Sequence, residues 1–310
     1  MSLWLTLTVA HVLAVLCLPV LLVGLVNRTK SLWAGRRGPG LWQSAWDLQR
    51  LLYKRPLRSS VSTPLFQLAP AVTLAGALVA ALVAPMWGAF APLQFANDFV
   101  LFAYVLGLAR MFLTLSALDV GSSFEGMGAA REVSFTVFIE PALFLLLGCA
   151  SLLGTQHSLA GLIGNFQRSE LFPWLAPLAV LVLLILLQVE AARVPVDDPS
   201  THLELTMVHE VMLLDFSGPD LAMMQYAAAV KMALYAGLIA ALLNPLDPLT
   251  EPLAAVLCSL GLMALVALFV GCTESLLARL RLRWVPAYLL LASFAAALCL
   301  ALVWLFGSRA

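Results

Sequence analysis

Residues 173–190 read PWLAPLAVLVLLILLQVE, an uninterrupted apolar run that ends in an acidic residue. A helix of about 20 mainly apolar residues is long enough to cross the hydrocarbon core of a bilayer. Seven further apolar runs of that kind occur along the chain, at 3–26, 66–87, 97–118, 133–153, 221–243, 252–273 and 285–306. The sequence therefore predicts an all-α, polytopic membrane protein with eight transmembrane helices, in which residues 1–310 form a single membrane domain.

The composition excludes a soluble or disordered chain. Hydrophobic residues make up 62% of the 310 positions, charged residues make up 11%, and the mean hydropathy is +0.98. Soluble domains are about 45–50% apolar and about 25% charged. The 17 basic and 17 acidic residues cancel, so no overall charge indicates a nucleic-acid partner. Residues 1–26 lack a basic start and a cleavage site, which predicts a retained first span.

The basic residues predict how the chain lies in the membrane. Four alternate connections, at 27–65, 119–132, 191–220 and 274–284, contain thirteen of the 17 Lys and Arg residues. Basic connections stay in the cytoplasm. These loops should therefore be cytoplasmic, with both termini outside. Within the first loop, 41–54 has apolar residues at helical spacing and basic flanks, which predicts an interfacial amphipathic helix.

Five ionisable residues fall within or at the ends of the predicted spans, where charge is costly. They are Arg110, Glu140, Glu190, Lys231 and Glu274. All lie in the predicted cytoplasmic half, so a proton path through them would stop near mid-membrane and continue laterally into another subunit. Pro141 favours this interpretation, because it breaks the helix hydrogen bonding beside Glu140. The alternative is a structural ion pair between Glu140 and Lys231.

The loop 191–220 combines acidic and imidazole side chains. Asp198-Pro199 is typical of a helix start and Gly218-Pro219 of a helix stop, so a helix over 199–216 is predicted. One helix cannot converge its ionisable side chains on a metal ion. A buried cluster with shifted pKa values is expected instead, or structural contacts with a partner protein. The side chains concerned are His202, Glu204, His209, Glu210 and Asp215.

The cysteines show no pattern that would bind a redox centre. All five lie in apolar stretches, none forms CxxC, and none is spaced near a histidine. We expect them to be small buried hydrophobic residues, with neither a disulfide framework nor an iron–sulfur cluster held by this chain alone.

Several motifs occur in a fixed order. ArgArgGlyProGly at 36–40 ends the first basic stretch, GluPro stands at 140–141, and ArgValProValAsp opens the acidic loop at 193–197. Longer signatures occupy 109–132 and 274–282. Over essentially the whole chain, this order resembles the eight-helix membrane protein that is a component of both respiratory complex I and the group 4 membrane-bound [NiFe] hydrogenases. The resemblance is closer to the formate hydrogenlyase and hydrogenase-4 branch.

The resemblance implies a subunit that performs no redox chemistry itself and has no catalytic residue. It would anchor a cytoplasmic redox arm in the inner (plasma) membrane and link it to proton or sodium translocation. Hydrogenase-like large and small subunits carrying Fe–S clusters and nickel–iron, antiporter-like membrane subunits and the lipid bilayer would be its partners. Quinone at the interface is implied for the alternative, an NADH-quinone oxidoreductase-type complex. A stand-alone cation/proton antiporter is a further alternative, against which the one-sided charges and missing repeats argue.

The residues and the resemblance together assign two groups of positions. Gly38-Pro39-Gly40 favours a shaped loop that docks a partner. The predicted interface with the peripheral arm comprises Arg36, Arg37, Gly38, Arg131, Arg193, Asp197 and His202. The predicted proton path comprises Asp119, Glu132, Glu140, Glu190, Arg110, Lys231, Glu204, His209, Glu210, Asp215 and Glu274. The acidic loop departs from the family pattern, because two histidines replace part of an acidic run.

Overall fold

The computed structural model describes residues 2–58, 62–197 and 207–306. All regular secondary structure in these residues is helical. Eight helices are long and apolar enough to cross a membrane, as the sequence predicts. They are α1 (Ser2–Trp33), α3 (Pro64–Val83), α4 (Asp98–Asp119), α5 (Ser123–Leu152), α7 (Phe172–Glu190), α8 (Gly218–Leu243), α9 (Pro252–Leu276) and α10 (Val285–Phe306).

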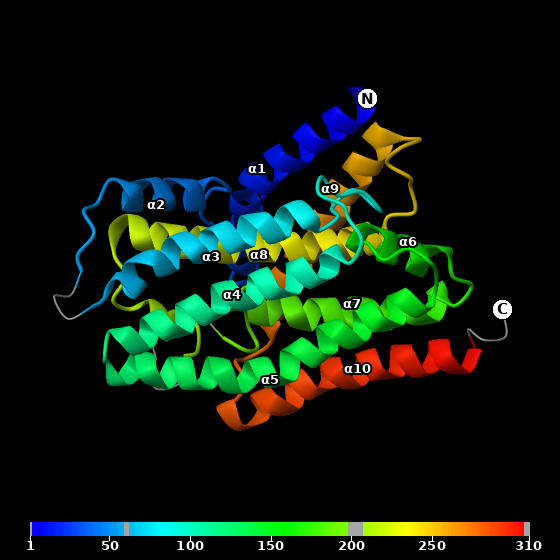
Figure 1. Cartoon of the computed structure of the whole chain (residues 1–310). Coiled ribbons are helices and arrows are strands. Elements are labelled where there is room, and N and C mark those ends of the chain that lie inside the picture. The colour runs from blue at the N-terminus through cyan, green and yellow to red at the C-terminus, as the bar shows by residue number, and fades with distance from the viewer. Residues whose placement is uncertain (1, 59–61, 198–206, 307–310) are drawn as a thin grey trace.

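Two shorter α-helices lie at opposite ends of the bundle (Figure 1). The amphipathic α2 (Gln43–Leu52) packs against α1 and α8 and confirms the helix predicted within 41–54. The second, α6 (Leu159–Arg168), was not predicted. The sequence does contain a helix start there: Ser158 is a typical N-cap, and apolar residues follow it at helical spacing. In the structure the Ser158 hydroxyl accepts from the Gly161 amide. The start of α1 and the end of α10 both lie toward the α6 end (Figure 1), as an even number of spans predicts.

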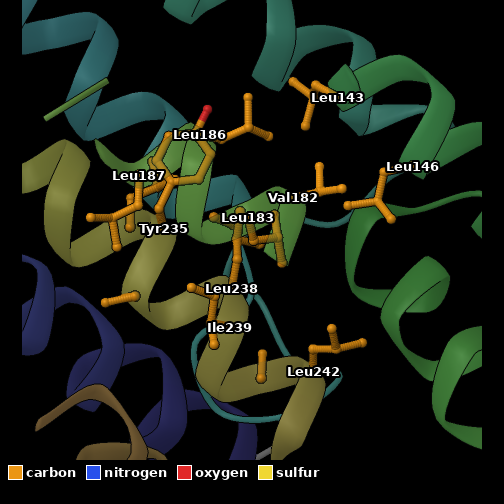
Figure 2. Packing of buried hydrophobic residues seen from close by; sticks show 14 of the residues in the cluster. Leu143, Leu146, Val182, Leu183, Leu186, Leu187, Tyr235, Leu238, Ile239 and Leu242 are labelled. Atoms are coloured by element: carbon orange, nitrogen blue, oxygen red, sulfur yellow. The ribbon is translucent and has the colours of Figure 1, made fainter. Parts of the chain in front are cut away.

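The helix α8 forms the centre of the bundle. In its most apolar stretch 83% of the residues are buried, and it packs against α1, α3, α7 and α9. Figure 2 shows how leucines of α5 and α7 interlock with Tyr235, Leu238 and Ile239 of α8. The outer helices α5 and α10 lie side by side along one flank (Figure 1). Their exposed apolar side chains suit a lipid environment.

The structure corrects four predictions. First, residues 119–132 are mostly helix, because α5 begins at Ser123 and runs through Pro141 without ending. Second, within the described part of 199–216, residues 207–216 hold only a short 3-10 helix, η1 (Glu210–Leu213). Third, Gly218-Pro219 starts α8 rather than stopping a helix. Fourth, only Cys149 and Cys299 are buried, and Cys17 is exposed on the surface of α1.

His11 of α1 has a structural explanation. Its Nε2–H donates to the Ala81 carbonyl over 2.9 Å, and the side chain is fully buried. The residue four places after Ala81 is Pro85, which has no amide hydrogen to give that carbonyl its helical bond. The histidine therefore supplies the donor that α3 lacks at its end.

Candidate functional site

An ion-paired triad lies where α4, α7 and α8 meet. Arg110 of α4 donates to Oε1 of Glu190, the last residue of α7. Lys231 of α8 donates from Nζ to the other oxygen, Oε2, over 3.1 Å. All three side chains are at most 9% exposed. The carboxylate is therefore held between two cations, which offsets part of the cost of burying the three charges.

Arg110 also reaches two carboxylates of α5. Its Nε lies 3.5 Å from Oε1 of Glu132, and its Nη1 lies 3.3 Å from Oε1 of Glu140. We call Arg110, Glu132, Glu140, Glu190 and Lys231 the buried charge cluster. It brings together side chains of four helices that are up to 121 positions apart in the sequence. With all groups ionised it holds three negative and two positive charges, so one negative charge is in excess.

The predicted structural pair between Glu140 and Lys231 is wrong. Each residue pairs instead with a different member of the cluster: Glu140 with Arg110, and Lys231 with Glu190. The reason is the helix arrangement, since α7 lies beside α8 and places Glu190 next to Lys231. Tyr235, one helical turn beyond Lys231, is fully buried and lines the same cavity as Arg110 and Glu190.

A second group of charges ties the connecting loops to the bundle. The Glu274 carboxylate at the end of α9 lies 2.9 Å from Nζ of Lys30 and 3.5 Å from Nη1 of Arg193. Nearby, Arg279 pairs with Asp197 over 3.1 Å. We call these five residues the loop charge cluster. It joins α1, α9 and the start of the loop 191–217.

The segment 207–213 lies between the two clusters. The Asp197 carboxylate accepts the backbone N–H groups of Val208 and His209, at 3.1 and 2.8 Å. Arg131 of α5 donates to the Met207 carbonyl over 2.7 Å. The segment packs directly on Gly128 of α5, where an added Cβ would lie 2.3 Å from a Val211 methyl carbon. A small residue is therefore required at Gly128 for this close contact.

Two titratable side chains on the segment have shifted pKa values. Burial lowers the pKa of His209 to about 4, and the charges of Lys231 and Arg110 lower it further while Glu190 opposes them. Burial raises the pKa of Glu210 to about 7, with the Asp197 charge adding to the shift and Arg193 opposing it. His209 is therefore neutral near pH 7, whereas Glu210 is close to half-protonated.

These shifts give docking of the segment two opposing pH dependences. Docked Glu210 holds more protons than a solvated carboxyl between about pH 4.5 and 7, so docking weakens as pH rises there. Docked His209 holds fewer protons between about pH 4 and 6.5, so docking strengthens as pH rises. In Glu210→Gln we expect docking of the segment to strengthen as pH rises, because only His209 still titrates. In His209→Gln we expect docking to weaken as pH rises, because only Glu210 still titrates. Hydrogen exchange of the 207–217 amides, corrected for intrinsic rates, measures both. Slopes of the same sign in the two variants would contradict this account.

Matches to known proteins cover nearly the whole chain. A family model described as NADH dehydrogenase matches residues 6–306. The chain belongs to this NADH dehydrogenase family. It is 30% identical to hydrogenase-4 component C of Escherichia coli K12, over 84% of this chain and 82% of that protein. It is 27% identical to formate hydrogenlyase subunit 4 of the same organism, over 86% and 88%.

Other relatives of this NADH dehydrogenase family member match less of it or at lower identity. An NADH-quinone oxidoreductase component of Geobacillus sp. WCH70 is 27% identical over 64% of this chain and 62% of that protein. A chain in the structure of the archaeal membrane-bound sulfane sulfur reductase, a respiratory membrane complex, has the same fold. It shares 17% identity with a TM-score of 0.78, over 97% of this chain and 99% of that one. The protein is thus a multi-pass membrane protein of this family, with eight candidate spans.

In this family member the structure brings most predicted path residues into the two clusters or the segment between them. Asp119 lies apart, where its carboxylate accepts the amide and hydroxyl of Thr63 at 2.7 and 3.0 Å. Asp215 also lies outside the clusters, and its backbone N–H donates to the buried carboxylate of Glu125 over 3.1 Å. Glu204 and His202 lie outside the described residues.

The predicted interface residues divide in the same way. Arg36, Arg37 and Gly38 are exposed in the connection after α1, where they are open to a partner. Arg131, Arg193 and Asp197 instead make contacts within the chain. Sequence reasoning missed Lys30 and Arg279, which counted only as basic loop residues although each pairs with a buried carboxylate. Among the described residues, no group of three His, Cys, Asp or Glu side chains has the arrangement of a metal site.

Proposed function

We propose that this chain is the membrane-anchoring and energy-coupling subunit of a hydrogenase-type complex in the inner (plasma) membrane. It would link a cytoplasmic redox arm to proton or sodium translocation. The observation that carries the proposal is the buried charge cluster, joined through 207–213 to the charged loops. The longer matches to the hydrogenase-4 and formate hydrogenlyase proteins favour this branch over the quinone-reducing one.

The charge balance of the buried cluster suits it to accept a proton. Three carboxylates face two cations, so one added proton makes the cluster neutral. Glu140 is the member best placed to take it, because its side chain is 54% exposed and touches the cluster through Arg110. The other carboxylates are enclosed and act by holding Arg110 and Lys231 in place.

The segment 207–213 would transmit the redox state of the partner. A charge change in a docked redox subunit shifts the protonation of Glu210, whose pKa of about 7 makes it sensitive near neutral pH. Glu210 follows His209 directly, and the Asp197 carboxylate binds the backbone N–H groups of Val208 and His209. A change in the protonation of Glu210 therefore alters the position of the His209 imidazole. Neutral His209 next to Lys231 and Glu190 can then pass a proton between loop and cluster.

The positions of the charged residues support a proposal for the partners. We propose that hydrogenase-like large and small subunits dock on the exposed residues around Arg36 and on the loop 191–217. These partners would hold the iron–sulfur clusters and the nickel–iron centre, and this chain would hold neither. Antiporter-like membrane subunits would receive the proton laterally. An NADH-quinone oxidoreductase-type complex, with quinone at the interface between this chain and its peripheral arm, is the alternative.

Gentle purification through this chain, with mass spectrometry of everything that co-purifies, tests the proposal. We expect a large subunit with two CxxC pairs of nickel ligands, a small Fe–S subunit and antiporter-like chains. A large subunit without the nickel ligands, beside antiporter-like chains, would replace the hydrogenase assignment with a complex I-like enzyme that acts on another substrate. Recovery of this chain alone, folded and homogeneous, would overturn the proposal and favour a stand-alone transporter.

A further inference from the structure

A groove runs along the outside of the bundle between α4 and α5. A cavity of about 340 Å³ lies in it, and its floor is formed by Arg110, Glu190 and Tyr235. Ala103, Tyr104 and Gly107 of α4 form one wall, and Glu140 and Phe144 of α5 form the other. The groove therefore leads from the surface of a membrane-spanning face to the buried charge cluster.

Glu140 is exposed in this groove. Its side chain is 54% exposed, whereas those of Arg110, Glu132 and Glu190 are 9%, 14% and 3% exposed. The residue lies inside a 30-residue span with Val137 and Phe144 exposed on the same side. A charged side chain near the bilayer centre costs roughly 2.5–3.5 kcal/mol even on permissive scales. Hydrocarbon lipid tails are thus an unfavourable neighbour for this face.

The charge balance indicates what should cover the carboxylate. With all groups ionised, the buried charge cluster has one negative charge in excess, and Glu140 is its most exposed carboxylate. A cation approaching from the groove would complete the balance. Ionisable residues in transmembrane segments normally pair with one another.

The shape of the groove suits a helix. Ala103 and Gly107 are four positions apart on α4, and a Cβ added at Gly107 would meet nothing within 4 Å. Gly148, two helical turns beyond Glu140 on α5, is open in the same way. Small residues at such spacing let the backbones of two membrane helices approach closely.

We propose that a transmembrane helix of a partner subunit lies in the α4–α5 groove and places a lysine or arginine against Glu140. This inference rests on the proposed function only in requiring a multi-subunit membrane complex. When this partner cation pairs with Glu140, it displaces the proton that Glu140 carries.

Filling the groove tests the docking. Gly107→Leu places a large side chain in the groove, and Gly261→Leu is the matched control on α9, where an added Cβ also meets nothing within 4 Å. In the intact complex purified through a tag on this chain, we expect Gly107→Leu to lower recovery of one membrane subunit by about tenfold, because overpacking an interface weakens it by that order. Gly261→Leu should leave recovery unchanged. Equal recovery in both variants would overturn the proposal.

A photoreactive amino acid identifies the occupant. We place it at Tyr104, which is 71% exposed and lines the same cavity as Glu140, and at Phe294 of α10, which is 68% exposed, as the control. In native membranes, Tyr104 should crosslink to a membrane subunit within a helix that contains Lys or Arg. The Phe294 probe should not label that helix. Phospholipid adducts alone at Tyr104, or a crosslinked helix without a basic residue, would overturn the proposal.

These outcomes are separable from a failure of the proposed function. A complex that contains no hydrogenase-like subunit, yet gives the Tyr104 crosslink and loses a partner in Gly107→Leu, would remove the hydrogenase assignment and leave the docking surface. A hydrogenase complex whose Tyr104 probe labels only lipid would keep the hydrogenase assignment and remove the docking surface.

Discussion

Arg110→Met is expected to leave little folded protein in the membrane. Arg110 contacts three carboxylates; without it Glu132 and Glu140 lose the cation that they pair with, and Glu190 keeps only Lys231. Removing one partner from a buried ion pair costs about 3–5 kcal/mol, a large part of the roughly 5–15 kcal/mol that stabilises a typical folded protein. Thermal unfolding of the purified complex and the yield of folded chain measure the effect.

Two variants control for this loss. Arg168→Met removes an exposed arginine at the end of α6 and should change stability by less than about 0.5 kcal/mol. Arg110→Met combined with Glu140→Gln returns the cluster to one excess negative charge and keeps the Lys231–Glu190 pair, so part of the stability should return. If Arg110→Met were as stable as the unaltered chain, the cluster would not hold the four helices together as described.

The eight spans could be predicted from the sequence because each must bury about 20 residues in lipid, and this length constraint leaves a plain apolar run. The extension of α5 to Ser123 could not, since its first turns are polar and are stabilised by packing of 207–213 on Gly128. Exposure of Cys17 likewise depends on which face of α1 the other helices cover. An apolar run shows that a helix is in the membrane, but not which side meets protein.

The acidic loop shows where local signals fail. The described residues 207–216 do not form the predicted helix, because the Asp197 carboxylate takes the amides of Val208 and His209. Burial of Val211 and Met212 against α5 then fixes a 3-10 turn. The pair Gly218-Pro219 is found at either end of a helix. Here it marks a start, because the proline lies in the first turn of α8 and Ser217 precedes the helix.

The candidate site could be predicted in its members but not in its pairing. Charges in apolar runs are visible in any sequence, and four of the five found there meet in the buried charge cluster, while Glu274 joins the loop charge cluster. Which carboxylate faces Lys231 depends on the neighbours of α8, and these are set by packing along its whole length. The roles of Lys30 and Arg279 were hidden for the same reason, because a basic residue near a span end already satisfies the positive-inside rule.

Glu190→Gln should uncouple the complex without dismantling it. Glutamine keeps the size of Glu190 and an oxygen that can accept from Arg110 or Lys231, so the helices stay together. The cluster then has two cations and two carboxylates, and the excess charge that attracts a proton is gone. Without that excess charge Glu140 is no longer driven to take a proton, and loss of a working proton-transfer group typically costs about 10²-fold or more. We therefore expect translocation to fall by at least about tenfold while redox turnover continues.

The ratio of protons translocated to electrons transferred, measured on the same proteoliposomes, tests the central claim most directly. Glu251→Gln, which removes an exposed acid before α9 at the opposite end of the bundle, is the control. The account predicts an unchanged ratio for Glu251→Gln and a ratio near zero for Glu190→Gln in a fully assembled complex. An assembled Glu190→Gln complex that pumps at the unaltered ratio would show that the buried charge cluster is structural and that coupling takes another route.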